Sequence, residues 1–187
     1  MKNRHRVVWT KGMFLTPQQF QTQDQFFEDN LQFRFAASQF ANWGVTDLEI
    51  DSDALANGAF RLARCSGVMP DGESFEMPDT DELPASRPVA EHFPPNRASL
   101  DVFLGIPENR PRARNVSIPA QEQTNGLPTT RYLAETRVFT DENTGNEEKP
   151  VQVARRAFRI MFEDEIATAS PRCASPRSSG MPPVFPF

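Results

Sequence analysis

The residues of this sequence that could do chemistry are few, and the largest group is an acidic run between positions 71 and 82. Its carboxylates are Asp71, Glu73, Glu76, Asp79, Asp81 and Glu82. Carboxylate oxygens are the ligands that Ca²⁺ prefers, so a calcium loop is one interpretation. The spacing does not match the EF-hand pattern. We therefore interpret the run as a solvated acidic loop and predict no metal site.

Nucleophilic and acid–base residues show no catalytic spacing. Cys65 and Cys173 lie far apart outside any CxxC motif, so neither a disulfide framework nor a zinc site is predicted, and Cys65 is expected to be a buried strand residue. His92 lies in the proline-rich stretch "EHFPPN", which has no nucleophile signature. Glycine-rich phosphate loops are also missing from the sequence. We predict no enzyme and no cofactor.

The stretch "VVWTKGMFLTPQQFQTQDQFF", residues 7–27, places an unusual number of apolar side chains close to the N-terminus. Trp9, Met13 and Phe14 surround Gly12, where the chain can bend, and they are typical of the anchor residues of a binding peptide. The alternative is an N-terminal strand that packs against the protein's own sheet. We favour a partner-binding segment over residues 1–15.

A helix start follows this segment. Thr16 is a suitable N-cap, Pro17 suits the first helical position because its missing N–H is not needed there, and Gln19 completes a capping box. The helix is predicted over residues 17–40.

Apolar residues of the predicted helix fall on two opposite sides, because each residue turns the helix by about 100°. One stripe is Phe20, Phe27, Leu31 and Phe35, and the other is Phe26, Phe33, Ala37 and Phe40. A surface helix needs only one apolar face. We expect one stripe to pack on the body of the chain and the other on another chain. The alternative is that both stripes are buried in one small core.

After Gly44 the apolar period changes to two. The predicted strands are residues 45–50, 58–67, 74–77, 100–106, 130–139 and 151–162, the last with a bulge or break at Arg155–Arg156. Asp71–Gly72 predicts a hairpin and residues 141–150 a long polar turn. Leu100, Val102, Leu104 and Ile106 alternate as one face of a half-buried strand. This pattern predicts a mainly β protein, an antiparallel β-sandwich with one long N-terminal helix at its edge or end.

Composition narrows the class of protein. The chain has 187 residues and a net charge of −5, which suits one domain with a tail and argues against a nucleic-acid partner. No apolar run reaches the roughly 18 residues of a membrane span. No signal peptide follows the first basic residues, so a cytoplasmic location is expected. Residues 166–187 have no Asp, Glu or Lys and are rich in Ser and Pro, which predicts a disordered tail.

Three stretches resemble the TssK family, the cytoplasmic baseplate subunit of bacterial type VI secretion systems. They are "VVWTKGMFLTPQQFQTQDQFFE", "CSGVMPDGESFEMP" and "YLAETRVFTDENTGNEEKPVQVARRAFRIMFEDE". The resemblance covers about residues 6–165, in order. It implies a sandwich similar to the shoulder of phage receptor-binding proteins, spanning residues 16–165 together with the helix.

In the family, this first domain faces the TssF/TssG wedge, members form homotrimers, and a C-terminal head contacts TssL and TssM. The resemblance therefore implies a non-catalytic structural adaptor that docks onto TssF and TssG and does not itself insert into a membrane. The positions to which partner contact is carried over are Val8, Trp9, Gly12, Met13, Phe14, Leu15, Pro17, Gln18 and Phe20.

The sequence departs from the family after Glu165, where a turn, a strand and the neck would follow. A reading frame shifted by one base would restore a family-like peptide, so we expect a truncated or frameshifted member that lacks the contact with TssL and TssM. Whether it still trimerises is left open. The competing interpretation is a phage-like receptor or carbohydrate-binding sandwich that recognises its ligand through the loop 71–82.

Overall fold

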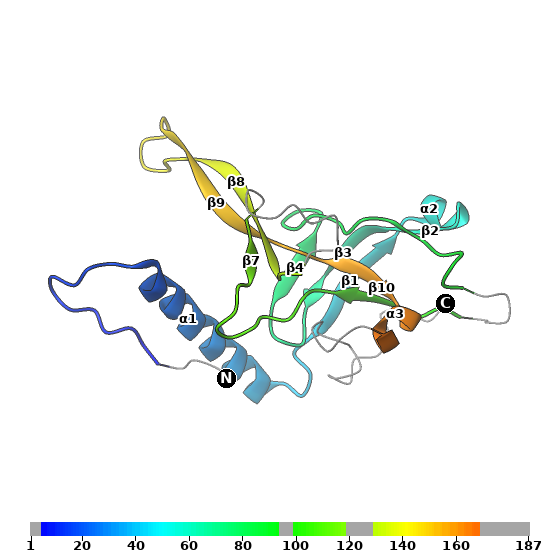
Figure 1. Ribbon diagram of the computed structural model, residues 1–187, viewed down its shortest axis with the longest axis horizontal. Helices are drawn as coiled ribbons and strands as arrows, with labels where there is room; N and C mark the ends of the chain where they lie inside the picture. The colour runs from blue at the N-terminus through cyan, green and yellow to red at the C-terminus, as the bar shows by residue number, and fades with distance from the viewer. Residues whose placement is uncertain (1–4, 94–98, 119–128, 169–187) are drawn as a thin grey trace. The chain divides into compact units, whose positions relative to one another are not determined.

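The computed structural model describes residues 5–93, 99–118 and 129–168 (Figure 1). The elements are α1 Pro17–Ser38, β1 Gly44–Ile50, α2 Ser52–Ala56, β2 Ala59–Phe60, β3 Leu62–Val68, β4 Ser74–Met77, β5 Arg87–Pro88, β6 Val102–Gly105, β7 Val116–Ser117, β8 Tyr132–Thr140, β9 Glu148–Arg156, β10 Arg159–Phe162 and α3 Glu163–Thr168. Strands dominate, and α1 is the one long helix of this described part. The predicted mainly β class is confirmed.

The strands form four small sheets in the described part of the chain. Their orders are β1-β3-β4, β10-β6, β2-β5 and β7-β8-β9. The β10-β6, β2-β5 and β8-β9 pairs are antiparallel, whereas β7 runs parallel to β8. Every predicted strand segment contains an observed strand. The break in the last one falls at residues 157–158, between β9 and β10, just after the predicted position at Arg155–Arg156. The prediction missed α2, β5, β7 and α3, which are all six residues long or shorter.

The chain divides into two compact units. The first contains residues up to Gly44 together with the tip of the β3–β4 hairpin, Gly67–Ser74, and the second contains Val45–Ser66 and the chain from Phe75 onward. We call them the helical unit and the strand unit.

Helix α1 begins at Pro17, as its capping signals predict. The backbone N–H of Thr16 donates to Oε1 of Gln19 at 2.6 Å, which is one half of a capping box. The helix ends at Ser38, two residues before the predicted end. Residues 5–16 contain no strand, so the alternative of an N-terminal strand is wrong.

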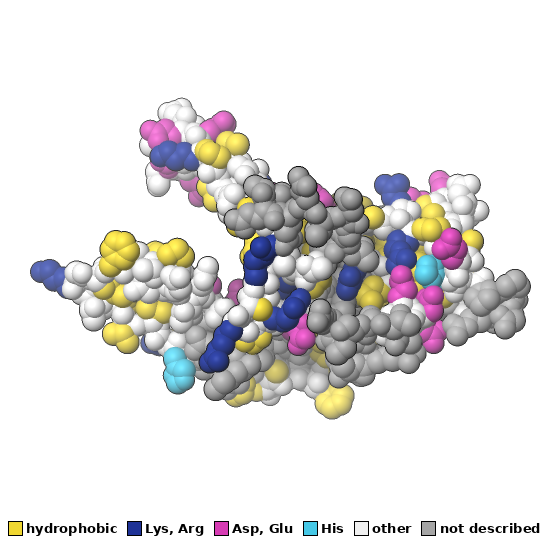
Figure 2. All heavy atoms as spheres, viewed as in Figure 1, with side chains coloured by type: hydrophobic (Ala, Val, Ile, Leu, Met, Phe, Trp, Pro, Cys, Tyr) yellow, Lys and Arg dark blue, Asp and Glu magenta, His cyan; other side chains and the backbone are white. Residues whose placement is uncertain are grey.

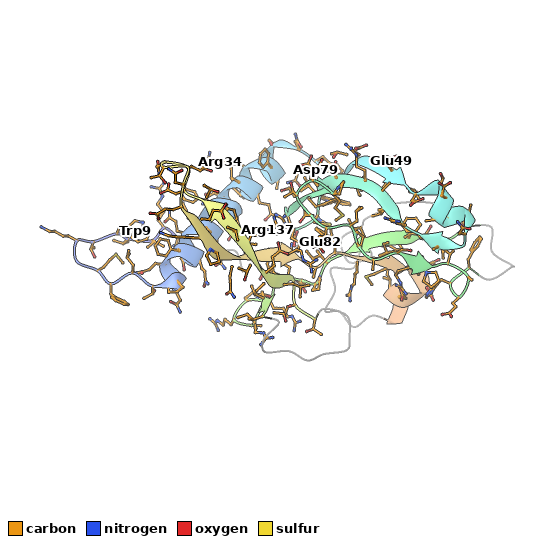
Figure 3. All side chains as sticks on the ribbon, turned by 90° about the horizontal axis from the view of Figure 1, so that it is seen from above. Trp9, Arg34, Glu49, Asp79, Glu82 and Arg137 are labelled. Carbon is orange, nitrogen blue, oxygen red and sulfur yellow. The ribbon has the colours of Figure 1, made fainter. Side chains whose placement is uncertain are left out.

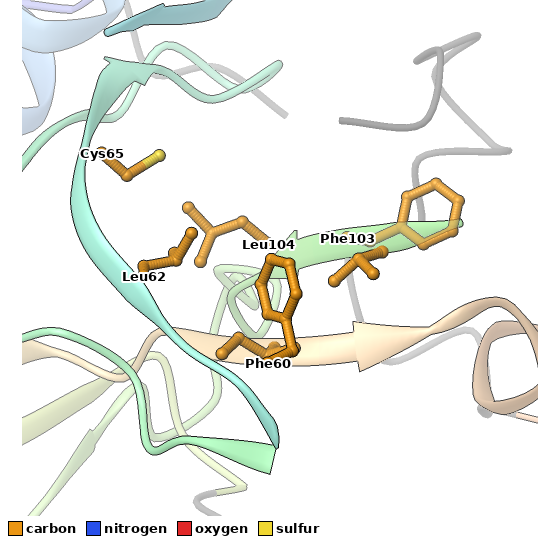
Figure 4. Close-up of a pocket in the computed structure, with 7 residues that line it drawn as sticks. Phe60, Leu62, Cys65, Phe103 and Leu104 are labelled. Carbon is orange, nitrogen blue, oxygen red and sulfur yellow. The ribbon is translucent and has the colours of Figure 1, made fainter. Parts of the chain in front are cut away.

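The core of the strand unit is made of apolar side chains with a relative exposure of 7% or less. They are Phe60, Leu62, Cys65, Phe75, Met77, Leu100, Val102, Phe103, Leu104, Ile106, Ala157, Ile160, Met161, Phe162 and Ile166. Figure 4 shows part of this core, where the side chains leave a cavity of about 10 Å³. A space of that size holds one water molecule at most, so it is a packing defect and not a ligand site.

Cys65 is buried, as expected. Burial, with a smaller contribution from the nearby charge of Asp47, raises the pKa of its thiol to about 11. The thiol is therefore protonated at neutral pH and is a poor nucleophile.

Strand β6 corrects the predicted alternation. Phe103, which the period of two places on an outer face, is only 5% exposed. It pairs with Met161 of β10 and forms a buried cluster with Met161 and Ile166 of α3. Helix α3 therefore covers the second face of this two-stranded sheet, and a strand buried on both faces does not alternate.

Ile166 also corrects the predicted start of the tail. Residues 166–168 belong to α3 and Ile166 is buried, so the ordered fold extends past Glu165. The rest of the predicted tail, residues 169–187, lies outside the described residues.

The acidic run is only partly solvated. Its Asp71–Gly72 pair forms the predicted turn, in which the N–H of Gly72 donates to the carbonyl of Met69 at 2.9 Å. Asp81, in contrast, is 4% exposed, lies 2.9 Å from the guanidinium of Arg156 and accepts a hydrogen bond from the N–H of Glu76. Asp81 is thus a structural carboxylate, which corrects the interpretation of the whole run as a solvated loop.

Candidate protein-binding surface

The N-terminal segment, residues 5–16, doubles back along α1 (blue in Figure 1). Gly12 has a φ of +81°, in the left-handed region that favours glycine, and the N–H of Met13 donates to the carbonyl of Thr10 at 3.3 Å. This turn reverses the chain just before the helix starts. The segment is therefore a folded part of the helical unit.

Two aromatic contacts attach the segment to the helix. The ring centroids of Trp9 and Phe20 are 6.1 Å apart in a tilted arrangement, and the guanidinium carbon of Arg6 lies 5.4 Å from the ring centroid of Phe26. Both geometries are favourable. Figure 3 shows Trp9 on the strip of chain that precedes α1. The contact of Arg6 had no signal in the sequence, because a cation over a ring depends on the path of the folded chain.

Most of the predicted contact residues are exposed. Val8 is 74% exposed and Phe14 87%, and Trp9, Leu15 and Phe20 each expose about half of their surface. Figure 2 shows hydrophobic side chains at the surface of the helical unit. Exposed apolar side chains grouped in one place are a mark of protein-binding surfaces.

The other predicted contact residues have different positions. Met13 is half-buried, and Pro17 and Gln18 are exposed in the first turn of α1. A Cβ added to Gly12 would meet no heavy atom within 4 Å, so the role of this glycine is its backbone conformation. The structure thus brings Trp9 and Phe20 together and presents Val8, Phe14 and Leu15 outward.

Apolar residues of α1 are exposed on both sides of the helix, and no side chain of α1 is buried. Phe27, Leu31 and Phe35 of one stripe and Phe33 of the other are about half exposed. Phe26 is the half-buried exception, under Arg6. The alternative that both stripes are buried in one core is wrong. We also expected one apolar stripe of the helix to pack on the body of the chain, and this stays a prediction.

A group of hydrogen-bonded charged side chains surrounds α3 in the strand unit. Arg87 donates to both carboxylate oxygens of Glu165, at 2.6 and 2.8 Å, and to the carbonyl of Ile160 at 3.1 Å. Glu165 also accepts a hydrogen bond from the N–H of Phe162. Although burial raises the pKa of Glu165, these hydrogen bonds and the charge of Arg87 outweigh it, and the pKa lies below its usual value.

His92 adds a second pair to the same helix. Its Nδ1 lies 2.8 Å from a carboxylate oxygen of Asp164, and its ring stacks on Phe162 at 4.3 Å. Burial raises the pKa of Asp164, but the hydrogen bond and charge of His92 outweigh it, and the pKa is lowered. The guanidinium carbon of Arg87 also lies over the Phe162 ring, 4.9 Å from its centroid. This arrangement fixes α3 on the core and has the form of a structural clamp.

The described ranges contain neither a candidate metal site nor a candidate membrane-spanning helix. No group of three or more His, Cys, Asp and Glu residues within them is placed to hold a metal ion. Within the same ranges, no helix combines the length and the apolarity that crossing a bilayer requires.

Comparison with known proteins places the chain in a family. Residues 19–174 match the family T6SS_VasE, described as "Bacterial Type VI secretion, VC_A0110, EvfL, ImpJ, VasE". Over 164 residues the chain is 33% identical to "Type VI secretion system baseplate component TssK1" of Pseudomonas aeruginosa. The aligned region covers 87% of this chain and 35% of the relative. The chain thus spans about a third of the length of that relative.

Solved structures share the fold. "Crystal structure of TssK" matches with a TM-score of 0.72 and 30% identity, over 91% of this chain and 36% of that one. A TssK-TssF-TssG baseplate subcomplex matches with a TM-score of 0.73 at 23% identity, over 86% of this chain and 51% of the other. A chain of the type VI baseplate complex matches with a TM-score of 0.74 at 22% identity, over 91% and 52%. The predicted resemblance is confirmed, and this chain belongs to the VasE/TssK family of bacterial type VI secretion proteins.

Proposed function

We propose that this chain is a non-catalytic structural adaptor of the type VI secretion baseplate, which docks onto TssF and TssG in the cytoplasm. Family membership supports the baseplate role, and a relative of the same fold was solved in a TssK-TssF-TssG subcomplex. The docking surface is the N-terminal segment with the first turn of α1, from Val8 to Phe20. We further propose that the family's homotrimer is the functional assembly.

The observation that carries the docking proposal is the exposure of Val8 and Phe14 on a segment that is itself attached to the helix. Trp9 and Arg6 hold the segment against Phe20 and Phe26. A pre-ordered apolar anchor loses little conformational entropy when it binds, so more of its burial appears as affinity.

The test is binding of the whole chain to a TssF–TssG complex, measured by calorimetry. Phe14→Ala should weaken binding by about 2 kcal/mol, the scale of an interface anchor, while the free energy of unfolding stays within about 0.5 kcal/mol. Trp9→Ala should weaken binding similarly but also loosen the segment, because it removes the ring contact with Phe20.

Phe40 supplies the matched control, because it is fully exposed and lies beyond the other end of α1. A 22-residue helix is about 33 Å long, so Phe40→Ala should leave binding unchanged. Equal losses for Phe14→Ala and Phe40→Ala would contradict a localised anchor. Full binding by Phe14→Ala would contradict the docking surface itself.

The competing function, a receptor or carbohydrate-binding sandwich that uses the loop 71–82, has weaker support. Asp81 is buried and paired with Arg156, so it is not free to bind a ligand. Because carbohydrate sites of this kind need several loop carboxylates for a cation, losing one of them to the fold disfavours the site.

A further inference from the structure

The two outer edges of the β8–β9 hairpin are not equivalent. Nine residues of β8 pair with nine of β9, from Tyr132↔Arg156 to Thr140↔Glu148. In the part of the chain that the structure describes, β7 pairs only with Tyr132 and Leu133 at the start of β8. Figure 1 shows the rest of the hairpin projecting beyond the other strands of the strand unit. Within the described residues, both long edges of this projection therefore carry backbone groups that the sheet does not use.

Backbone groups of β8 face its two sides alternately, and two hydrogen bonds fix which residues face outward. The N–H of Tyr132 donates to the carbonyl of Asn115, just before β7, at 3.0 Å, so this even-numbered residue faces away from β9. The N–H of Asp141 donates across the hairpin to the carbonyl of Glu147 at 2.7 Å, so the odd-numbered residues face β9. Antiparallel pairing keeps this alternation along the strand. The outward row of β8 therefore consists of the N–H and carbonyl groups of Ala134, Thr136, Val138 and Thr140.

The edge of β9 is interrupted, whereas the edge of β8 is continuous. Pro150 is the partner of Val138, and because opposite residues of an antiparallel pair share their orientation, Pro150 faces outward on the edge of β9. Proline has no N–H, so the outward row of β9 lacks a donor there. Lys149 precedes it, and Lys and Pro are the residues with which natural sheets block their edges. The sequence of β8 contains no Pro, Gly or Lys.

The side chains beside the outward row of β8 suit a neighbouring strand. One face of the ribbon is uncharged over three consecutive cross-strand pairs, which are Ala134–Ala154, Thr136–Gln152 and Val138–Pro150. On the other face, Arg137 is ion-paired with Glu135, and Phe139 follows at 49% exposure. Val138 is 62% exposed. Exposed β-branched and aromatic side chains stabilise a sheet when a further strand places similar side chains next to them.

The end of the hairpin adds a negative charge at one end of this row. We call residues 141–148 the hairpin tip; all of them are exposed, and the charged ones are Asp141, Glu142, Glu147 and Glu148. Lys149 lies 3.2 Å from Glu147 and offsets one of these charges. Figure 2 shows acidic and hydrophobic side chains together at the end of the projection. A strand that lies along β8 has one end beside this tip, where a basic residue would be attracted.

We propose that the outer edge of β8 binds an extended segment of another protein, which adds a strand to the sheet from Ala134 to Thr140. The segment spans about seven residues, or about 23 Å, with β-branched or aromatic residues at alternate positions and Lys or Arg beside the hairpin tip. Hydrogen bonds to the outward row supply the affinity, and the alternate side chains and the tip supply the selectivity. This site is separate from the docking surface at Val8–Phe20 and does not rest on the proposed function.

The probe for this site is a library of random nonapeptides displayed on phage and selected on the whole chain. Each enriched peptide is then assayed on two proline variants. Thr136→Pro removes an outward donor of β8 without removing a hydrogen bond of the hairpin, as Pro150 does naturally on β9. Gln152→Pro is the matched control, because Gln152 is the partner of Thr136 and faces outward on the opposite edge. We expect peptides of the proposed pattern that lose at least about tenfold in affinity on Thr136→Pro and bind Gln152→Pro as they bind the parent.

Amide hydrogen exchange, followed for each residue by NMR, tests the geometry directly. With one such peptide bound, the outward N–H groups of Ala134, Thr136, Val138 and Thr140 should exchange at least about tenfold more slowly. The odd-numbered residues between them are already bonded to β9 and should change little. Contact through side chains alone would not produce this alternation. The same measurement on the free proline variants shows whether the inward groups stay protected, and therefore whether the hairpin is intact.

A charge variant tests the role of the tip. Glu142→Gln together with Glu148→Gln should weaken peptides that end in Lys or Arg severalfold, and raised ionic strength should act in the same direction on the parent chain. Unchanged affinity in both measurements would contradict the expected basic residue.

Four results would overturn the strand-adding site. The first is a selection that yields no peptide sensitive to Thr136→Pro. The second is equal loss on Thr136→Pro and Gln152→Pro, and the third is protection that does not alternate along β8. The last is protection of the outward groups in the chain alone as its concentration rises, which would assign this edge to a second copy of the chain.

Discussion

The helical unit and the strand unit use the same residue type in opposite ways. Phe60 and Phe162 of the strand unit are 1% and 0% exposed, whereas Phe14 and Phe40 of the helical unit are 87% and 108% exposed. Phenylalanine contributes most to folding when it is buried and most to association when it is exposed on an ordered element. Phe60 and Phe162 therefore stabilise the strand unit, whereas Phe14 is exposed, as the proposed docking surface requires.

Truncating one phenylalanine in each unit gives the largest expected effect. Phe162→Ala should lower the free energy of unfolding by about 4 kcal/mol, because it opens a cavity beneath His92 and Arg87. Phe14→Ala should change it by less than about 0.5 kcal/mol. Urea denaturation measures both. Similar losses would mean that the two units do not differ in this way.

The second prediction concerns the pH dependence of the clamp at α3. The pKa of Glu165 is lowered in the folded state from its ordinary 4.5, so its contribution is complete above that pH and is lost as the pH falls through the folded pKa. Glu165→Gln should cost about 2 kcal/mol at pH 7, because Arg87 loses a charged partner. The variant should also lose less stability than the parent between pH 5 and pH 3.

Thermal unfolding at several pH values measures this difference. Glu82→Gln is a suitable control, because Glu82 is an exposed carboxylate paired with Arg155. It should cost less than about 1 kcal/mol and leave the pH profile nearly parallel to that of the parent. Parallel profiles for Glu165→Gln would exclude the clamp as a source of acid sensitivity.

The smallest expected effect concerns the turn of the β3–β4 hairpin, which belongs to the helical unit. Gly72 has a φ of +96°, and a Cβ placed there would lie 2.8 Å from the side chain of Gln32, whose Nε2 donates to the carbonyl of Asp71. Gly72→Ala should cost about 1 kcal/mol through backbone strain and this clash. In a Gln32→Ala background the additional cost should fall, because only the strain remains. Equal costs in both backgrounds would show that the hairpin does not rest on α1.

Local signals explain what could be predicted. The start of α1 at Pro17, the Asp71–Gly72 turn and strand β4 at residues 74–77 were all predictable, because each depends on neighbouring residues. The concentration of apolar residues at Val8–Phe20 was also visible in the sequence. Their exposure was not, because it depends on which elements cover them.

The sequence by itself determined the type of most elements and the family, since capping boxes, turn residues and apolar periods act over a few residues. Only the tertiary structure decided that Asp81 is buried with Arg156, 75 residues away, and that Phe103 is covered by Ile166. Burial and pairing between distant residues are properties of the folded chain, because a side chain's environment is set by segments that its local sequence does not specify.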